Sequence, residues 1–161
     1  MKQALLHRLR ELDIVRYQTV QLKHAGNSSF YVDIKKAYGD PLALRLMSDA
    51  LWEIIDKRAT CIVAGGYGGL PLGTALSVMH NLPLTLVREQ AKGRGTNALL
   101  EGYIPTRNDR AVVVDDVCST GKSLEAYIKA IPDVEILGAY AIVRRANVVS
   151  ALFTVEELIQ E

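Results

Sequence analysis

The spacing of apolar residues changes along the chain, and each kind of spacing predicts a different element. Apolar residues recur every three or four positions in residues 2–12 and 41–56, which predicts two amphipathic helices. Later, short runs of continuous apolar residues favour strands that are buried on both faces. These runs predict strands at 60–64, 83–89, 111–115 and 134–145. Further helices are expected after the first run, through about His80, and at 119–131.

The order of these elements predicts an α/β fold with a parallel central sheet flanked by helices. The segment before them differs, because 15–23 and 29–36 look like two strands joined by a turn at HAGNS. We expect this hairpin to be an addition to the sheet. Between the two parts, Asp40 and Pro41 are residue types that begin a helix.

Composition and charge limit the class of protein. The chain has 161 residues, 49% of them hydrophobic, which predicts one domain with a sizeable core. The formal net charge of +1 gives no reason to expect nucleic acid or an anionic membrane as a partner. Cys61 and Cys118 lack CxxC or Cys/His spacing, so a cytoplasmic protein without a structural disulfide or zinc site is expected. The charged N-terminus predicts neither a signal peptide nor a membrane span.

The stretch VVVDDVCSTGKS at residues 112–123 carries the most specific chemistry. It follows a predicted buried strand, and ligands of parallel sheets bind beyond the carboxyl ends of strands. A nucleotide-triphosphate loop needs glycine where this chain has Asp116, and a carboxylate there would repel the triphosphate. That interpretation is therefore disfavoured. A purely structural alternative is that Asp115 and Asp116 only cap the following helix.

A sugar-phosphate site fits this stretch better. The backbone N–H groups of the loop from Cys118 to Ser123, at the start of a helix, can bind one phosphate monoester. Asp115 and Asp116, called here the acidic doublet, can accept hydrogen bonds from neighbouring hydroxyls. A 5-phosphorylated ribose offers both kinds of group.

The same residues carry a family resemblance. VVVDDVCSTGKS resembles the motif that binds 5-phosphoribosyl 1-diphosphate (PRPP) in type I phosphoribosyltransferases. Further segments resemble most closely the orotate phosphoribosyltransferases: Lys23 with HAGNSSFYVDIKKAYGDP, then GGYGGLPLGTAL, LTLVREQAKGRGTNALLEG, AIVRRA and ALFTVEELI. The resemblance spans about residues 10–161. It implies a single phosphoribosyltransferase domain over 1–161, with a small hood made mainly of 1–40 and a core at about 41–150.

The resemblance also implies a reaction. The enzyme would transfer the 5-phosphoribosyl group of PRPP to orotate, giving orotidine 5'-monophosphate and diphosphate, a step of pyrimidine (UMP) biosynthesis. Mg²⁺ would be the cofactor, held mainly by PRPP without direct protein ligands. A homodimer with shared active sites is expected, because in this family a mobile loop reaches the neighbouring subunit's site. Neither nucleic acid nor a membrane is expected as a partner.

Roles for individual residues follow from the same resemblance. The catalytic residues would be Arg88, Lys92, Arg94, Asp115 and Asp116. PRPP would be bound by Tyr67, Gly68, Arg88, Lys92, Asp115, Asp116, Val117, Cys118, Ser119, Thr120, Gly121, Lys122 and Ser123. Orotate would be bound by Lys23, Phe30, Tyr31, Ser119 and Arg145. A solvated basic loop at 88–94 and hairpin packing at 30–31 are the structural alternatives.

Three positions depart from the orotate pattern. Gly68 stands where a lysine is usual, Glu89 where a second basic residue is usual, and Arg144 where an aspartate is usual. Gly68 and Glu89 remove or reverse positive charge near the expected leaving group. Two alternatives therefore stay open: a type I transferase for a purine or xanthine-like base, and a PRPP-sensing regulator with weak or no turnover.

Overall fold

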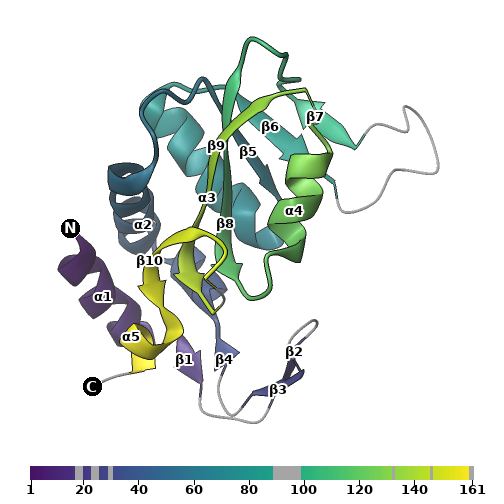
Figure 1. Ribbon diagram of the computed structural model, residues 1–161. Helices are drawn as coiled ribbons and strands as arrows, with labels where there is room; N and C mark the ends of the chain where they lie inside the picture. The colour runs from purple at the N-terminus through teal and green to yellow at the C-terminus, as the bar shows by residue number, and fades with distance from the viewer. Residues whose placement is uncertain are drawn as a thin grey trace.

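The fold is built around a six-stranded sheet (Figure 1). The computed structural model describes residues 1–16, 20–22, 26–28, 31–88, 99–131, 133–145 and 147–159. The sheet contains β5 Cys61–Gly65, β6 Leu84–Val87, β7 Leu100–Gly102, β8 Arg110–Cys118, β9 Glu135–Arg144 and β10 Ser150–Thr154. Their order is β10-β9-β8-β5-β6-β7, and every neighbouring pair is parallel except β6 and β7. The predicted parallel sheet is confirmed, with β7 as an antiparallel edge strand.

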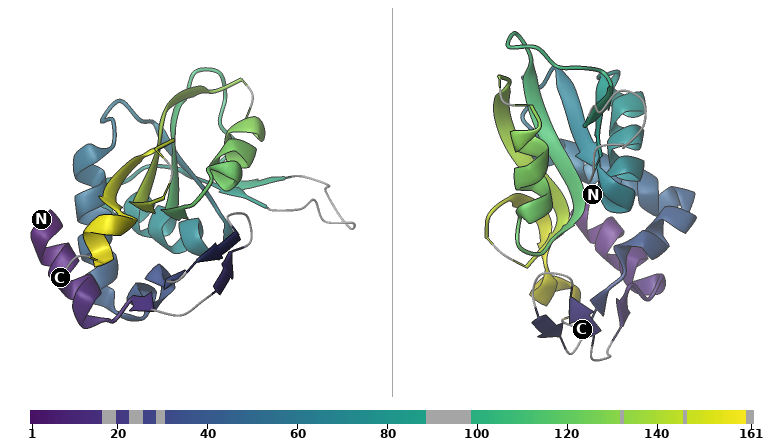
Figure 2. Two further views of the ribbon diagram at one scale, coloured as in Figure 1. Left: turned by 60° about the horizontal axis from the view of Figure 1, so that its bottom comes forward. Right: turned by 90° about the vertical axis from the view of Figure 1, so that its right-hand side faces the viewer.

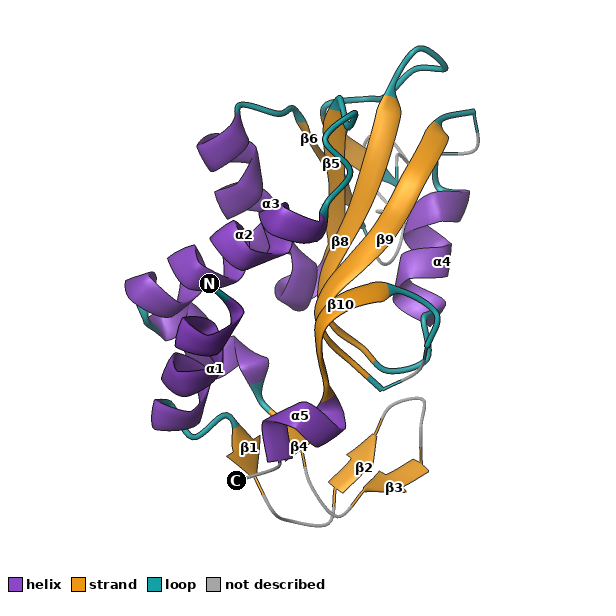
Figure 3. Cartoon of the chain, turned by 60° about the vertical axis from the view of Figure 1, so that its left-hand side comes forward, coloured by secondary structure: helices purple, strands orange, loops and turns teal. Residues whose placement is uncertain are grey.

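Helices cover both faces of this sheet. They are α1 Lys2–Glu11, α2 Pro41–Ile54, α3 Gly66–His80 and α4 Lys122–Lys129. Figure 3 shows α1, α2 and α3 on one face and α4 on the other. Consecutive strand residues point to opposite faces, and accordingly Ile62 belongs to the core cluster under α2 and α3, whereas Val63 belongs to the cluster under α4. This two-sided burial explains why the strands are continuously apolar.

The strand β8 is longer than the sequence predicts. We expected a strand at 111–115, but β8 stays paired with β9 as far as Cys118. Asp115 lies opposite Ala141, and Cys118 lies opposite Arg144. The acidic doublet is therefore part of the strand rather than the loop after it, which fixes the backbone of both carboxylates.

The N-terminal part forms two small antiparallel pairs. β1 Val15–Arg16 pairs with β4 Tyr31–Val32, and β2 Val20–Leu22 pairs with β3 Gly26–Ser28. In Figures 1 and 2 both pairs lie beyond the carboxyl ends of the central strands. The pairing of β1 with β4 agrees with the predicted hairpin, whereas β3 lies inside the stretch HAGNS that was predicted as its turn.

The predicted end of the second hairpin strand is wrong. Instead of a strand through 36, the chain forms the 3-10 helix η1 Ile34–Gly39. Ile34 and Ala37, three residues apart, are both buried. This spacing matches the three residues per turn of a 3-10 helix, so one side of η1 can pack against the core.

The C-terminal strand and helix have a local signal that the apolar pattern alone did not show. β10 pairs in parallel with β9 and is followed by α5 Val155–Ile159. The backbone N–H of Thr154 donates to Glu157 Oε2 at 2.7 Å, and the Glu157 N–H donates to Thr154 Oγ1 at 3.3 Å. This reciprocal pair is the capping box that begins a helix.

Asp40 begins α2 as predicted and also joins it to α1. Its carboxylate accepts hydrogen bonds from the backbone N–H groups of Leu42 and Ala43, both at 3.3 Å. Arg8 Nε donates to Asp40 Oδ2 at 2.6 Å.

We expect Asp40→Ala to lower the melting temperature by about 2–4 °C, because it leaves the first N–H groups of α2 without their cap. Asp40→Asn keeps a capping oxygen and should lose less than half as much. Thermal unfolding followed by circular dichroism measures both changes. Equal melting temperatures for wild type and Asp40→Ala would contradict the capping role.

Candidate active site

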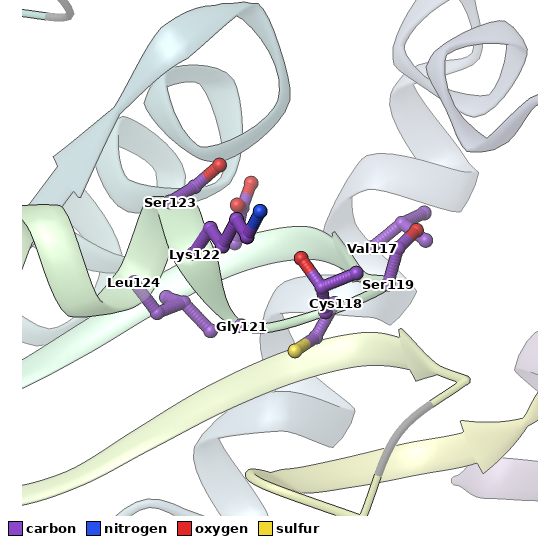
Figure 4. A pocket seen from close by; sticks show the side chains of 9 residues that line it. Val117, Cys118, Ser119, Gly121, Lys122, Ser123 and Leu124 are labelled. Atoms are coloured by element: carbon purple, nitrogen blue, oxygen red, sulfur yellow. The ribbon is translucent and has the colours of Figure 1, made fainter. Parts of the chain in front are cut away.

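The loop between β8 and α4 surrounds a small pocket (Figure 4). Helix α4 begins at Lys122, three residues later than predicted, because Gly121 has a φ of 85° that a right-handed helix does not allow. The pocket has a volume of about 110 Å³. It is lined by Asp115, Val117, Cys118, Ser119, Thr120, Gly121, Lys122, Ser123 and Leu124. In Figure 4 the side chains of Lys122 and Ser123 project to one side of the turn, and the Cys118 sulfur points the other way.

A larger cavity of about 340 Å³ adjoins this pocket and shares four lining residues with it. The shared residues are Asp115, Val117, Ser119 and Ser123. The other lining residues are Tyr31, Val32, Lys35, Gly65, Gly66, Tyr67, Gly68, Asp116 and Tyr127. The fold thus brings the acidic doublet, the glycine-rich segment and part of the N-terminal region around one space.

The glycine-rich segment, residues 65–69, begins α3: Gly65 is the N-cap and Gly66–Gly69 form the first turn. A Cβ atom at Gly68 would lie 2.2 Å from Asp116 Oδ1, which is far inside contact distance. Only glycine therefore allows the Asp116 carboxylate to lie against this turn. The N-terminal end of a helix carries partial positive charge, which favours an anion at this place.

The acidic doublet is buried and hydrogen-bonded. Asp115 is 8% exposed and Asp116 is 4% exposed. Asp115 Oδ1 accepts from the Asp116 N–H at 2.9 Å, and Asp116 Oδ1 accepts from the Val117 N–H at 2.7 Å. Lys35 Nζ donates to Asp116 Oδ2 at 3.2 Å. Burial, and next the charge of Asp116, raise the pKa of Asp115 to about 8.

Comparison with known proteins assigns this arrangement to a family. Residues 35–148 match the phosphoribosyl transferase domain. The chain belongs to the phosphoribosyltransferase family. This range includes the acidic doublet, the loop after it and the glycine-rich segment.

Several relatives of this phosphoribosyltransferase are orotate phosphoribosyltransferases. The one from Methanothermobacter thermautotrophicus is 36% identical over 137 residues, covering 83% of this chain and 73% of the relative. The one from Pyrococcus furiosus is 33% identical over 150 residues, covering 90% and 82%.

Solved structures show the same fold. The crystal structure of orotate phosphoribosyltransferase from Aeropyrum pernix superposes with a TM-score of 0.81 at 25% identity, covering 96% of both chains. Adenine phosphoribosyltransferase from Rhodothermus marinus shares the fold at 23% identity, with a TM-score of 0.71 over 95% of this chain and 99% of that one. The fold is therefore common to enzymes named for different bases, and the base must be argued from the site.

Other predicted site residues of the phosphoribosyltransferase lie in different surroundings. Arg88, after β6, forms an ion pair with Glu101 of β7. Tyr31 of β4 lines the larger cavity. Arg145 follows β9, and its backbone N–H donates to the Cys118 carbonyl at 2.9 Å. Lys23, Phe30, Lys92 and Arg94 lie outside the described residues, as does Glu89.

Two residues near the site were missed in the sequence. They are Lys35, which contacts Asp116, and Tyr38, whose hydroxyl donates to the Gly68 carbonyl. Burial raises the pKa of Tyr38, so this phenol remains a hydrogen-bond donor at neutral pH. Both belong to η1, which we had partly predicted as strand. Ile34 and Ala37 are three residues apart, and so are Lys35 and Tyr38. This spacing could have predicted that Lys35 and Tyr38 share a side of η1, the one toward the site.

The described residues hold no group of three or more His, Cys, Asp or Glu side chains that could bind a metal ion. None of the helices in the described part of the chain has the length and apolar character needed to cross a membrane.

The raised pKa of Asp115 predicts a pH-dependent stability. An unfolded aspartate titrates near 3.9, so in the folded protein Asp115 keeps its proton up to about pH 8. The resulting stabilisation is full below the unfolded pKa and is lost as the pH rises through the folded pKa. Between pH 5 and pH 8.5, Asp115→Asn should gain stability relative to wild type, because only the wild type loses the stabilisation of a protonated Asp115 over this range.

Urea unfolding at the two pH values measures this gain. Asp109→Asn is the control, because the N–H of Thr106 and then side-chain hydrogen bonds lower the pKa of Asp109. Its contribution is lost only in acid, so Asp109→Asn should change stability equally at pH 5 and pH 8.5. A constant difference between wild type and Asp115→Asn would contradict the protonated aspartate.

Proposed function

We propose that this chain is an orotate phosphoribosyltransferase, which uses PRPP and orotate to form orotidine 5'-monophosphate and diphosphate. One observation carries the proposal: the acidic doublet and the loop at 119–123 face adjoining cavities that share four residues. In this proposal the doublet supplies hydroxyl acceptors and the adjoining turn binds the phosphate. The names of the archaeal relatives support orotate as the base.

In this proposal PRPP is held at both ends of its ribose. Asp115 and Asp116 accept hydrogen bonds from the ribose hydroxyls, and the negative charge of the doublet strengthens such bonds. The 5-phosphate lies at residues 119–123, where the N-terminal turn of α4 supplies backbone donors and Lys122 adds a cation. Val117 and Cys118 form the wall of this pocket.

The reaction then needs positioning and charge stabilisation. The bond from ribose C1 to the diphosphate oxygen breaks, and its electron pair leaves with diphosphate. A bond forms from C1 to a ring nitrogen of orotate, which gives up its proton. Negative charge grows on the leaving diphosphate, so cations and N–H groups aimed at it lower the barrier. We propose that Tyr67 and Gly68 lie along the diphosphate and that Arg88, Lys92 and Arg94 act on it.

Mg²⁺ is proposed as the cofactor. Its chemistry fits the site, because two carboxylates face the larger cavity and oxygen atoms are the ligands Mg²⁺ prefers. PRPP oxygens would be its main ligands, with Asp115 and Asp116 holding it through water. When bound, Mg²⁺ neutralises charge on the diphosphate.

Orotate is proposed to lie between the hood and the strand ends. Tyr31, which lines the larger cavity, would cover the ring together with Phe30. Arg145 and Lys23 would bind the carboxylate, for which a guanidinium is well suited. Ser119 would contribute a hydroxyl from the loop.

We also propose a homodimer with shared active sites, as the family resemblance implies. The cytoplasmic location stays a prediction, which the free and buried state of Cys61 and Cys118 supports.

A base panel tests the proposed function. Purified protein with PRPP and Mg²⁺ is offered orotate, uracil, adenine, guanine and xanthine in parallel, and diphosphate release is measured. We expect release with orotate alone. Release with a purine or with xanthine would assign the chain to another transferase. PRPP binding without release for any base would indicate a sensor.

A further inference from the structure

At position 68, where the orotate pattern has a lysine, a side chain would force the Asp116 carboxylate to move. A Cβ atom at Gly68 would lie 2.2 Å from Asp116 Oδ1 and 2.6 Å from its Cγ. A longer side chain would therefore displace the carboxylate of the acidic doublet. Among the described cations expected at the diphosphate, Arg88 already has a carboxylate partner in Glu101. Within the described residues, a further cation beside the glycine-rich segment would have to come from another part of the chain.

Lys35 is the one cation among the described residues that line the larger cavity. Its ammonium lies 3.2 Å from Asp116 Oδ2, and its side chain is 48% exposed. The same cavity is lined by Gly65, Gly66 and Gly68. Lys35 is therefore close to the carboxylates and faces the same space as the first turn of α3.

Tyr38 fixes the helix that carries Lys35. Its hydroxyl donates to the Gly68 carbonyl, and Ile34 and Ala37 of the same 3-10 helix are buried in the core. The backbone of η1 is thus anchored on both sides of Lys35. The Lys35 side chain is 48% exposed, and a lysine stem has several rotatable bonds, so its ammonium can reorient.

We propose that Lys35 binds the diphosphate of PRPP and supplies the cation for which position 68 has no room. This inference rests on the proposed use of PRPP. In the free protein the ammonium neutralises Asp116. When the ribose hydroxyls donate to Asp116, they replace Lys35, and the ammonium turns to the diphosphate beside the glycine-rich segment. Lys35 then offsets the repulsion that the negative charge of the acidic doublet exerts on an anionic leaving group.

A purely structural role makes a different prediction. If Lys35 only held the Asp116 carboxylate in place, its loss would weaken every ligand that uses the ribose hydroxyls. If Lys35 binds the diphosphate, its loss weakens PRPP but spares ribose 5-phosphate, which has the same hydroxyls and 5-phosphate and no diphosphate.

Titration calorimetry with Lys35→Ala separates the two roles. We expect the Kd for PRPP with Mg²⁺ to rise about 10- to 100-fold, as for loss of one charged hydrogen bond. The Kd for ribose 5-phosphate should stay within about twofold of the wild-type value, because this ligand has no diphosphate and its other contacts are unchanged. Lys35→Arg, which keeps the charge, should recover most of the PRPP affinity.

Lys36→Ala is the matched control. Lys36 is the next residue of η1, but its ammonium donates to the Asp13 carbonyl at 2.6 Å, away from the cavity residues. The PRPP affinity of the Lys36→Ala variant should equal that of wild type. Melting temperatures of all variants show whether they fold. An unchanged PRPP affinity in folded Lys35→Ala, or an equal loss for ribose 5-phosphate, would overturn the proposal.

The calorimetry measures PRPP binding without a base. The proposed role of Lys35 and the proposed use of orotate can therefore be contradicted independently. A wild-type protein that binds PRPP but does not use orotate removes the proposed function and leaves the role of Lys35 to be decided by the calorimetry. A wild-type protein that does not bind PRPP overturns both.

Discussion

Replacing Asp116 with asparagine is expected to lower kcat/KM for PRPP by about 100- to 1000-fold, the range seen when one charged contact to a transition state is removed. The variant keeps the shape of the side chain but loses the negative charge that accepts from the ribose hydroxyls. Asp116 is buried, so water cannot take over this role. Steady-state diphosphate release at varied PRPP measures the loss.

Asp13→Asn is the control for this experiment. The Asp13 side chain is 83% exposed, and Asp13 has a φ of 49°, a left-handed conformation that asparagine tolerates. Its activity should equal that of wild type. A folded Asp116→Asn with kcat/KM within about threefold of wild type would contradict a charge-dependent contact, because loss of such a contact is expected to lower kcat/KM far more.

Replacing Gly68 with alanine is expected to lower kcat/KM for PRPP by about 100-fold, because a misplacement of about 1 Å in a catalytic arrangement has this effect. The added Cβ would meet Asp116 Oδ1 at 2.2 Å, so the carboxylate has to move. The same kinetic assay measures the loss, and circular dichroism shows that the variant is folded.

Gly39→Ala provides a matched comparison. Gly39 is the last residue of η1, and nothing lies within 4 Å of the Cβ that it would gain. Wild-type activity is expected for it. Full activity in Gly68→Ala would show that the position of the Asp116 carboxylate does not matter for PRPP.

The sequence predicted the central part of the site because its signal is local. The apolar run before Asp115 predicts a buried strand, and the small residues after Cys118 predict the turn before a helix. The structure extends the strand through Cys118, which apolar patterning could not show because two carboxylates interrupt it. The backbone of this segment stays paired with β9, because strand pairing uses backbone groups and does not depend on apolar side chains.

The cations could not be placed from the sequence. Arg88 pairs with Glu101, which the antiparallel pairing of β6 and β7 brings beside it, and this partner was not predicted. Lys35 and Lys36 are adjacent and chemically alike, and only the turn of η1 directs one to Asp116 and the other to Asp13. Such contacts depend on tertiary packing between distant segments.

The departure at Gly68 also has a structural explanation. The sequence comparison describes it as a lost lysine, whereas the structure shows a position where any side chain would meet Asp116. Arg144, where an aspartate is usual, donates to the Val149 carbonyl at 3.0 Å and so supports the connection from β9 to β10.

A crystal structure of the protein with orotidine 5'-monophosphate tests the central claim most directly. We predict the ribose hydroxyls within hydrogen-bond distance of Asp115 and Asp116, and the 5-phosphate at the backbone N–H groups of residues 119–123. A nucleotide bound with its phosphate or its ribose outside these two adjoining cavities would contradict the account.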